Sequence, residues 1–274
     1  MGVIAQPRLL LEVVRGGQSA IHVSVDDAIH SLAELVRRKP DSIFESNYFA
    51  FWRDLHDRFG VVVTHFLMDE NSGVINGLPP FHLGELGARW RDEFYENPWL
   101  CWGIHGKNQD TPMICQTAAE IHAMVSLMSE KILEFSGQAK LPHSWRSHFF
   151  VSGADASRMM RARGVGVYLT PDDNRLITGS LPPSLAATMA KGGITAQDPI
   201  SGLTCVRSEV RLERTTADEA CRAIEKAVAA TNVAAIFTHE HELLDIGWTD
   251  QWRARRADLA RVVEFASTLG TFVQ

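Results

Sequence analysis

The sequence AIHVSVDDAI, residues 20–29, contains the pattern from which the fold of this chain can be predicted. Apolar residues alternate along its first half, which is typical of a buried strand, and two adjacent acids, Asp26 and Asp27, follow them. Helix-forming residues continue to Arg38, so we expect the strand to pass into a helix that Asp26 or Asp27 caps. Two carboxylates would then lie at the carboxyl end of a strand, where α/β enzymes place their chemistry.

The same order, a short apolar strand and then a helix, recurs along the chain. The predicted strands cover residues 20–25, 61–68, 99–104, 140–145, 165–169, 203–212 and 233–237. Repeated units of this kind imply parallel strands with right-handed crossovers, which either close into a barrel or form a doubly wound sheet. No shift in composition marks a linker, so we expect residues 1–274 to form a single α/β domain.

Composition excludes several classes of protein. With 45% hydrophobic and 22% charged residues, the chain is typical of a globular protein rather than a disordered one. The net charge of -6 is spread over the sequence without a basic stripe, so we expect no nucleic-acid partner. No apolar run approaches the roughly 20 residues of a membrane helix, and no signal peptide is recognisable. The expectation is a cytoplasmic protein without a membrane partner, whose four cysteines are reduced thiols.

Polar side chains gather at the ends of the predicted strands. They are Asp26, Asp27, His65, His105, Arg146, Asp172, Asp173 and His239. The carboxyl ends of parallel strands meet at one edge of a sheet or barrel, so we expect these side chains to converge. Independent placement on the surface would not put all of them at strand ends.

The order of these motifs resembles the polysaccharide deacetylase family of carbohydrate esterases, whose fold is a distorted (β/α)7 barrel. SVDDAI matches the Asp-Asp pair of the family, HGKNQD its histidine motif, SWRSHFFVSG its arginine motif, YLTPDD its acidic motif and AAIFTHEHEL its late histidine motif. The resemblance covers roughly Ile21 to His241 and depends on the shared order, because each motif alone is short.

The resemblance implies a hydrolase and a role for each matched residue. Asp26 would be the general base, Arg146 would hold it ionised, and Asp173 would be the acid near that arginine. His239 would be the general acid that protonates the leaving amine. The implied reaction is metal-dependent removal of an N-acyl group, or cleavage of another non-peptide C–N bond, on a small-molecule or carbohydrate-like substrate.

The metal ligands implied by the resemblance are incomplete in this sequence. Asp27 and His105 would bind a divalent metal, with zinc as the expected ion. The family's second histidine would stand four residues after His105, but Gln109 occupies that position and is a poor zinc ligand. Candidates for the missing ligand are Asp110, His65 and His241. An altered metal preference, a rebuilt site and a catalytically silent relative are the three alternatives.

Two other functions stay open beside the leading hypothesis of a deacetylase-type hydrolase. One is a non-catalytic barrel that binds a sugar or nucleotide sugar and has lost part of the metal site. The other is a glycosidase that pairs Asp26 with Asp172 or Asp173, for which carboxyl separations of roughly 5 or 6.5–9.5 Å would decide the stereochemistry. The segment 176–200 would cap the pocket or mediate a homo-oligomer.

Overall fold

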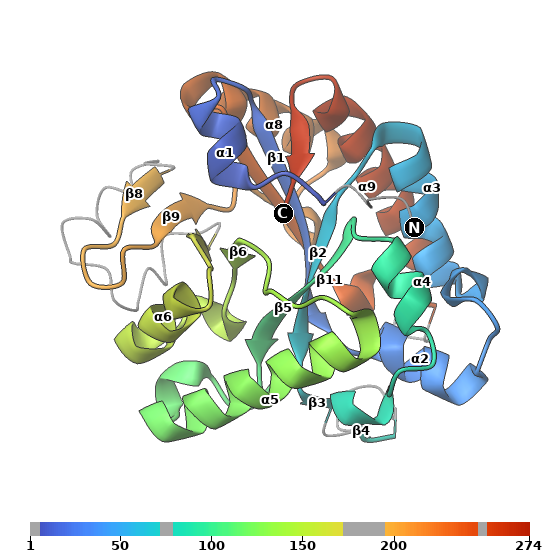
Figure 1. The fold of residues 1–274 in the computed structure, drawn as a ribbon. Helices are drawn as coiled ribbons and strands as arrows, with labels where there is room; N and C mark the ends of the chain where they lie inside the picture. Colours follow the sequence, from blue (N-terminus) through green and yellow to red (C-terminus); the bar gives the residue numbers. More distant parts are fainter. Residues whose placement is uncertain (1–5, 72–78, 172–194, 246–250) are drawn as a thin grey trace.

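Parallel strands surrounded by helices form the centre of the molecule (Figure 1). The computed structural model describes residues 6–71, 79–171, 195–245 and 251–274. The strands of the barrel are β1 (Ala20–Ala28), β2 (Val63–Met68), β5 (Leu100–Gly106), β6 (Ser144–Trp145), β7 (Val167–Thr170), β9 (Thr204–Arg207), β10 (Val210–Arg211) and β11 (Val233–His239). All pairs among these strands are parallel, which confirms the expected α/β barrel with parallel strands.

The paired strands fall into two groups. One group has the order β10-β11-β1-β2-β5, and the other has the order β6-β7-β9-β8, in which β8 is the short strand Thr195–Gln197. The chain itself joins them after β9, because the amide of Ser208 donates to the carbonyl of Thr170 and the next amide donates to β11. On the opposite side, the Gln138 side chain bonds to the backbone N–H and C=O of Trp102 on β5, at 3.0 and 2.9 Å. We call this junction between β5 and β6 the seam.

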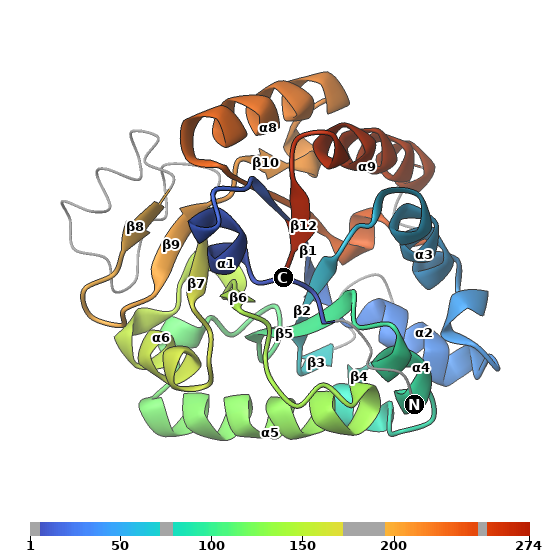
Figure 2. The ribbon, with the colours of Figure 1, turned by 45° about the horizontal axis from the view of Figure 1, so that its top comes forward.

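Helices lie outside the strands, as Figure 2 shows for α5, α6, α8 and α9. The helices are α1 (Leu10–Arg15), α2 (His30–Arg38), α3 (Asn47–Phe59), α4 (Arg91–Glu96), α5 (Ala118–Ser136), α6 (Gly153–Ala162), α8 (Ala217–Thr231) and α9 (Trp252–Ser267). A capping box of Thr117 and Glu120 starts α5, and Gly137 ends it in the left-handed conformation (φ 70°). Within the described ranges, no helix has the length and apolar character needed to cross a membrane.

Short elements complete the fold and account for three differences from the sequence-based expectations. They are β3 (Glu70–Asn71), β4 (Phe81–His82), β8 (Thr195–Gln197), β12 (Thr271–Val273), η1 (Ile43–Glu45), η2 (Leu83–Glu85), η3 (Met113–Cys115), η4 (His148–Phe150), η5 (Leu212–Arg214) and η6 (Glu240–Glu242). The sequence of residues 83–95 predicts one helix, but in the structure Gly87, whose φ is 56°, divides this stretch into η2 and α4. The strand expected over 140–145 is reduced to β6, and the strand over 203–212 changes its partner at Ser208.

The buried apolar residues form two clusters that leave the carboxyl ends of the strands polar. The smaller cluster joins residues of the strands to Leu10 and Val13, so α1 packs against the amino-terminal end of the barrel; its strand residues are Ala20, Phe66, Val167, Leu169, Val206, Val233, Ala235 and Val273. The larger cluster lies between the strands and the outer helices. At the carboxyl ends, the polar residues Asp26, His105 and Arg146 are buried instead.

Candidate active site

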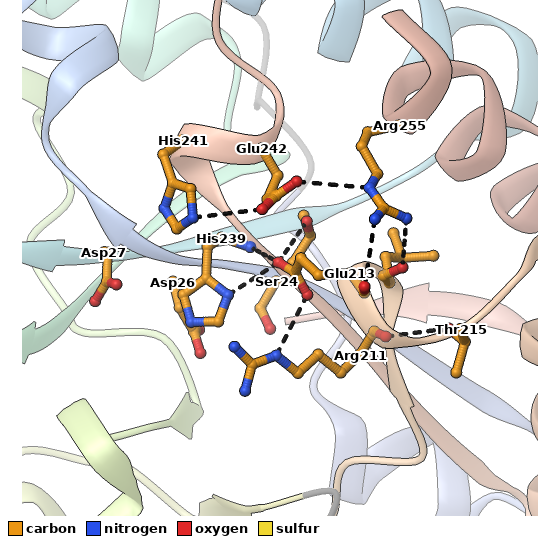
Figure 3. Close-up of polar contacts among 12 residues, drawn as sticks. Ser24, Asp26, Asp27, Arg211, Glu213, Thr215, His239, His241, Glu242 and Arg255 are labelled. Atoms are coloured by element: carbon orange, nitrogen blue, oxygen red, sulfur yellow. Dashed lines mark hydrogen bonds and ion pairs between the residues drawn. The ribbon is translucent and has the colours of Figure 1, made fainter. Parts of the chain in front are cut away.

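The two acids of β1 reach the site through a break in the regular pleat. The pairing of β1 with β2 shifts register between Val25 and Ala28, and Asp27 has a φ of 56°. Adjacent side chains of a regular strand point to opposite faces, so this irregularity allows Asp26 and Asp27 to point the same way (Figure 3). A residue other than glycine in this conformation costs roughly 1–3 kcal/mol, and such strain is concentrated at functional sites.

Neither acid caps the following helix, so that expectation was wrong. The helix α2 begins only at His30, and its N-cap residue makes no side-chain cap bond. Glu240, in η6 directly after β11, is fully buried and accepts the first amides of this helix instead, those of Ile29, His30 and Ser31, at 2.9, 2.6 and 3.0 Å. Because a carboxylate from η6 satisfies these amides, the two aspartates remain available to the site.

Three side chains from different strand ends form a group that could hold a metal ion. Asp27 lies in the bulge of β1, His105 lies near the end of β5, and His148 lies in η4 shortly after β6. One donor atom from each falls within 4.8 Å of the others. Oδ1 of Asp27 is 3.3 Å from Nε2 of His105 and 3.1 Å from Nδ1 of His148.

The hydrogen bonds around the two histidines show that this group fits a cation. Nδ1 of His105 bonds to the carbonyl of Arg146 at 2.9 Å, and Nε2 of His148 bonds to the carbonyl of Gln109 at 3.0 Å. A carbonyl only accepts, so these nitrogens carry the protons, and in the neutral rings the other nitrogens present lone pairs to Asp27. Within the described residues Oδ1 of Asp27 is buried and has no hydrogen-bond donor. Three electron-pair donors that face one another suit a divalent metal.

The charge of Asp27 agrees with this assignment. Burial works to raise the pKa of its carboxyl group, but the contacts with His105 and His148 outweigh burial and hold the pKa well below its usual range. The carboxylate is therefore ionised at neutral pH. A buried, ionised carboxylate requires positive charge beside it, which a bound cation would supply.

His148 supplies the third donor atom that Gln109 cannot provide. The three candidates named from the sequence for this missing ligand do not supply it. Gln109 contributes its backbone carbonyl, which orients His148, and Asp110 is exposed to solvent. His65 is fully buried among aromatic rings, with Trp102 stacked at 4.9 Å. The ring of His241 lies 5.5 Å from that of His239 and is not part of the group around Asp27.

Arg146 and Asp26 form a buried ion pair beside the group around Asp27. Nη1 of Arg146 donates to Oδ1 of Asp26 and to Oγ of Ser24, both at 2.8 Å, and Nη2 donates to Oγ of Ser208 at 2.7 Å. The ring of Phe237 lies 4.3 Å from the guanidinium carbon. Both charged side chains are almost completely buried, so the pair is held in one geometry.

His239 and Glu213 form a second charged pair at the end of β11. In the register of the two strands, His239 is the partner of Asp26, and its Nδ1 lies 2.9 Å from Oε1 of Glu213 in η5 (Figure 3). Burial works to lower the pKa of His239, but the hydrogen bond and the charge of Glu213 outweigh burial and raise it. Burial likewise works to raise the pKa of Glu213, but its bond to His239 brings the pKa down to about 2.

The structure brings most of the predicted site residues together. Asp26, Asp27, His105, Arg146 and His239 meet at the carboxyl ends of the strands. Asp173, and Asp172 before it, lie outside the described residues. Sequence reasoning missed His148 and Glu213, although each is a polar residue shortly after a strand, which is the same signal that identified His105.

No protein-family model matches the chain, and no curated protein matches it in sequence. The structure does resemble solved structures. A protein from Mycobacterium smegmatis assigned as a polysaccharide deacetylase has a TM-score of 0.52 and 12% identity, and the match covers 94% of this chain and 87% of that one. A family 4 carbohydrate esterase from Streptomyces lividans in complex with acetate has a TM-score of 0.48 and 10% identity, with coverage of 93% and 91%. A family 4 acetyl xylan esterase from Clostridium thermocellum in complex with a cobalt ion has a TM-score of 0.48 and 12% identity, with coverage of 93% and 87%.

The match to the Mycobacterium smegmatis structure concerns the fold. The chain has the fold of a polysaccharide deacetylase, as the order of its motifs predicts. The chemistry of this chain has to be argued from its own residues, because an identity of 12% carries no activity from one protein to the other.

Proposed function

We propose that the chain is a metal-dependent hydrolase that removes an N-acyl group, or cleaves another non-peptide C–N bond, on a carbohydrate-like substrate. One observation carries the proposal: three donor atoms, from Asp27, His105 and His148, meet within 4.8 Å at the strand ends. Beside them lie a carboxylate suited to a general base and an imidazole suited to a general acid, those of Asp26 and His239. The deacetylase fold agrees with this assignment.

The residues divide the reaction between them. A divalent cation bound by Asp27, His105 and His148, with zinc as the first candidate, would polarise the acyl carbonyl and make water more acidic. Asp26 takes the proton of the attacking water, and Arg146 balances the charge of that carboxylate through their 2.8 Å bond.

His239 completes the reaction on the leaving group. The leaving nitrogen needs a proton when the C–N bond breaks, and a protonated imidazole supplies it. Glu213 raises the pKa of His239, so that more of the imidazole is protonated near neutral pH. One proton passes from water to Asp26 and one from His239 to the amine, so the overall reaction is hydrolysis.

The two other functions have less support. The non-catalytic barrel depends on a missing ligand, and Nδ1 of His148 supplies a third donor 3.1 Å from Asp27. The glycosidase would pair Asp26 with an acid that lies outside the described residues, and no observation within them favours it.

Acetate release from N-acetylglucosamine oligomers by the zinc-loaded full chain tests the proposal. Asp26→Asn should keep the bound zinc and lower kcat/KM by about 10²–10⁴-fold, the usual contribution of a general base. Asp110→Asn is the matched control, because Asp110 is an exposed acid on the loop after β5. Parent-like acetate release by Asp26→Asn, or a parent protein that binds no zinc, would contradict the proposal.

A further inference from the structure

Arg211, on β10, has a guanidinium group whose terminal nitrogens make no bond within the described residues. Its Nε lies 3.5 Å from Oε2 of Glu213, and its guanidinium carbon lies 5.8 Å from the ring centroid of Phe237. These two contacts leave Nη1 and Nη2 without partners in the part of the chain that the structure describes. The side chain is 23% exposed, so a ligand can reach it.

The charge of Arg211 is only partly balanced by Glu213. Oε1 of Glu213 already accepts from Oγ1 of Thr238, at 3.0 Å, and contacts Nδ1 of His239, at 2.9 Å. Only Oε2 faces Arg211, and it does so at 3.5 Å, which is long for a charge-assisted hydrogen bond. One carboxylate is therefore shared between an arginine and a histidine.

Neighbouring arginines differ from Arg211 because their terminal guanidinium nitrogens already donate hydrogen bonds. Arg146 uses Nη1 and Nη2 on Asp26 and two serine hydroxyl groups. Arg255 donates to the carbonyls of Leu212 and Glu213 and lies 3.5 Å from Oε2 of Glu242. Those two arginines hold the site together, whereas Arg211 has donors to spare.

The spare donors of Arg211 point toward the reacting groups. In Figure 3 the guanidinium group of Arg211 extends toward the side on which Asp26 and His239 lie. A guanidinium group presents two parallel N–H donors that match the two oxygens of a carboxylate or phosphate. A neutral sugar hydroxyl group would leave most of this capacity unused.

We propose that Arg211 binds an anionic group of the substrate, and that the substrate class is an acidic N-acylated sugar. The inference rests on the proposed function, because that function places the acyl group between Asp26 and His239. The anionic group is a carboxylate or a phosphate carried by the same sugar unit or its neighbour.

Binding of three related sugars tests this inference without any turnover. The probes are N-acetylglucosamine, its 6-phosphate, and the matching uronic acid with a carboxylate at the same carbon. Zinc-loaded Asp26→Asn serves as background, so that nothing is hydrolysed during calorimetric titration. At least one charged sugar should bind about tenfold or more tightly than the neutral one, as one charge-assisted contact implies.

Substitution of Arg211 should remove that preference. Arg211→Gln should bring the charged sugar to the affinity of the neutral one and leave the neutral sugar unchanged. Arg211→Lys keeps the charge and should keep part of the preference, which guards against a variant that fails to fold. Arg58→Gln is the matched control, because Arg58 lies in an exposed ion pair at the end of α3, near the start of β2.

Two outcomes would overturn the inference. The first is equal binding, or no binding, of all three sugars by the background protein. The second is a loss that is the same for all three in Arg211→Gln, which would mean that Arg211 only shapes the Glu213 and His239 pair. Failure of the proposed function would show separately, as an absence of acetate release from the parent whatever the charge of the sugar.

Discussion

At the scale of single residues, the site depends on His148, a histidine that its position in the sequence did not single out. His148 lies two positions after Arg146, yet the carbonyl of Gln109, from the loop after β5, sets its tautomer. The side chain that the metal group needs and the carbonyl that orients it therefore come from different loops. An outer partner of this kind fixes the direction of the lone pair and strengthens the ligand.

Removal of His148 should abolish zinc binding, while removal of the Gln109 side chain should not. Loss of an outer hydrogen-bond partner costs roughly 10–100-fold in metal affinity, and His148→Ala should exceed this because it removes a donor itself. Gln109→Ala keeps the backbone carbonyl and is the control. Zinc content after dialysis and a competitive chelator titration measure both. Zinc retained in full by His148→Ala would show that another residue is the third ligand.

The pair of His239 and Glu213 should set the alkaline limit of activity. The general acid must be protonated, so activity falls as pH rises through the pKa of His239, which Glu213 raises. Glu213→Gln removes that effect and should move the alkaline limb of kcat/KM to lower pH. Glu225→Gln, on α8, is the control with the same change of side chain. An alkaline limb that does not move in Glu213→Gln would show that another group limits the rate.

At the scale of elements, η6 connects the two halves of the proposed chemistry. Glu240 directly follows His239 and holds the amides that start α2, which begins three residues after Asp27. Each of the three hydrogen bonds is to a charged acceptor, and the carboxylate is fully buried. This contact fixes the distance between His239, the proposed general acid on β11, and the two aspartates of β1.

Loss of the Glu240 carboxylate should destabilise the protein strongly. Glu240→Ala leaves three buried amides without an acceptor, and each such group costs about 1–3 kcal/mol. We therefore expect a loss of about 3 kcal/mol or more in the free energy of unfolding. Glu240→Gln keeps one acceptor oxygen without the charge, so its free energy of unfolding should fall by less. Urea denaturation measures both, and an unchanged midpoint for Glu240→Ala would contradict the role of this carboxylate.

Most elements could be predicted because their signals are local. The strand before Asp26 shows alternating apolar residues, and α5 starts on a capping box at Thr117. The start of α2 could not be predicted, because its cap comes from a residue 211 positions away in the chain. The bulge at Asp27 could not be predicted from the sequence either, because the residues VDDA are equally compatible with a regular strand whose last residue caps the next helix.

At the scale of the whole molecule, buried histidines should make the fold sensitive to acid. Burial lowers the pKa of His65 to about 3, and burial together with the charge of Arg146 lowers that of His22 to about 3. Between about pH 6.5 and about pH 3, the unfolded chain binds protons at these groups and the folded chain does not. Stability is therefore complete above pH 6.5 and is lost as pH falls.

His65→Leu should weaken this dependence on pH. Each buried histidine contributes a slope of roughly 1.4 kcal/mol per pH unit below pH 6.5, so the variant should lose about that much slope. Its stability at pH 7 should change little, because His65 is surrounded mainly by aromatic rings, against which a leucine side chain also packs. His122→Leu, exposed on α5, is the control. Denaturation curves at several pH values measure the slopes, and an equal slope in parent and His65→Leu would contradict the prediction.

The site as a whole was only partly predictable, for a physical reason. Residues at strand ends are brought together by the parallel order of the strands, so Asp26, His105 and His239 could be selected in advance. Which of several polar residues in a loop turns inward depends on how the loops pack. The choice of His148 over Gln109, and of Glu213 as the partner of His239, is made by contacts between distant segments. The assignment of residues 1–274 to one domain remains a prediction.

The seam between β5 and β6 has a consequence for how relatives of this protein would diverge. His105 on β5 bonds to the carbonyl of Arg146 after β6, and Arg146 bonds to Asp26 on β1, so site residues also tie the two strand groups together. A descendant that lost the proposed chemistry would still be selected to keep these ties. In a comparison of relatives, retention of His105 and Arg146 would therefore not identify working enzymes, whereas retention of His148 together with His239 would.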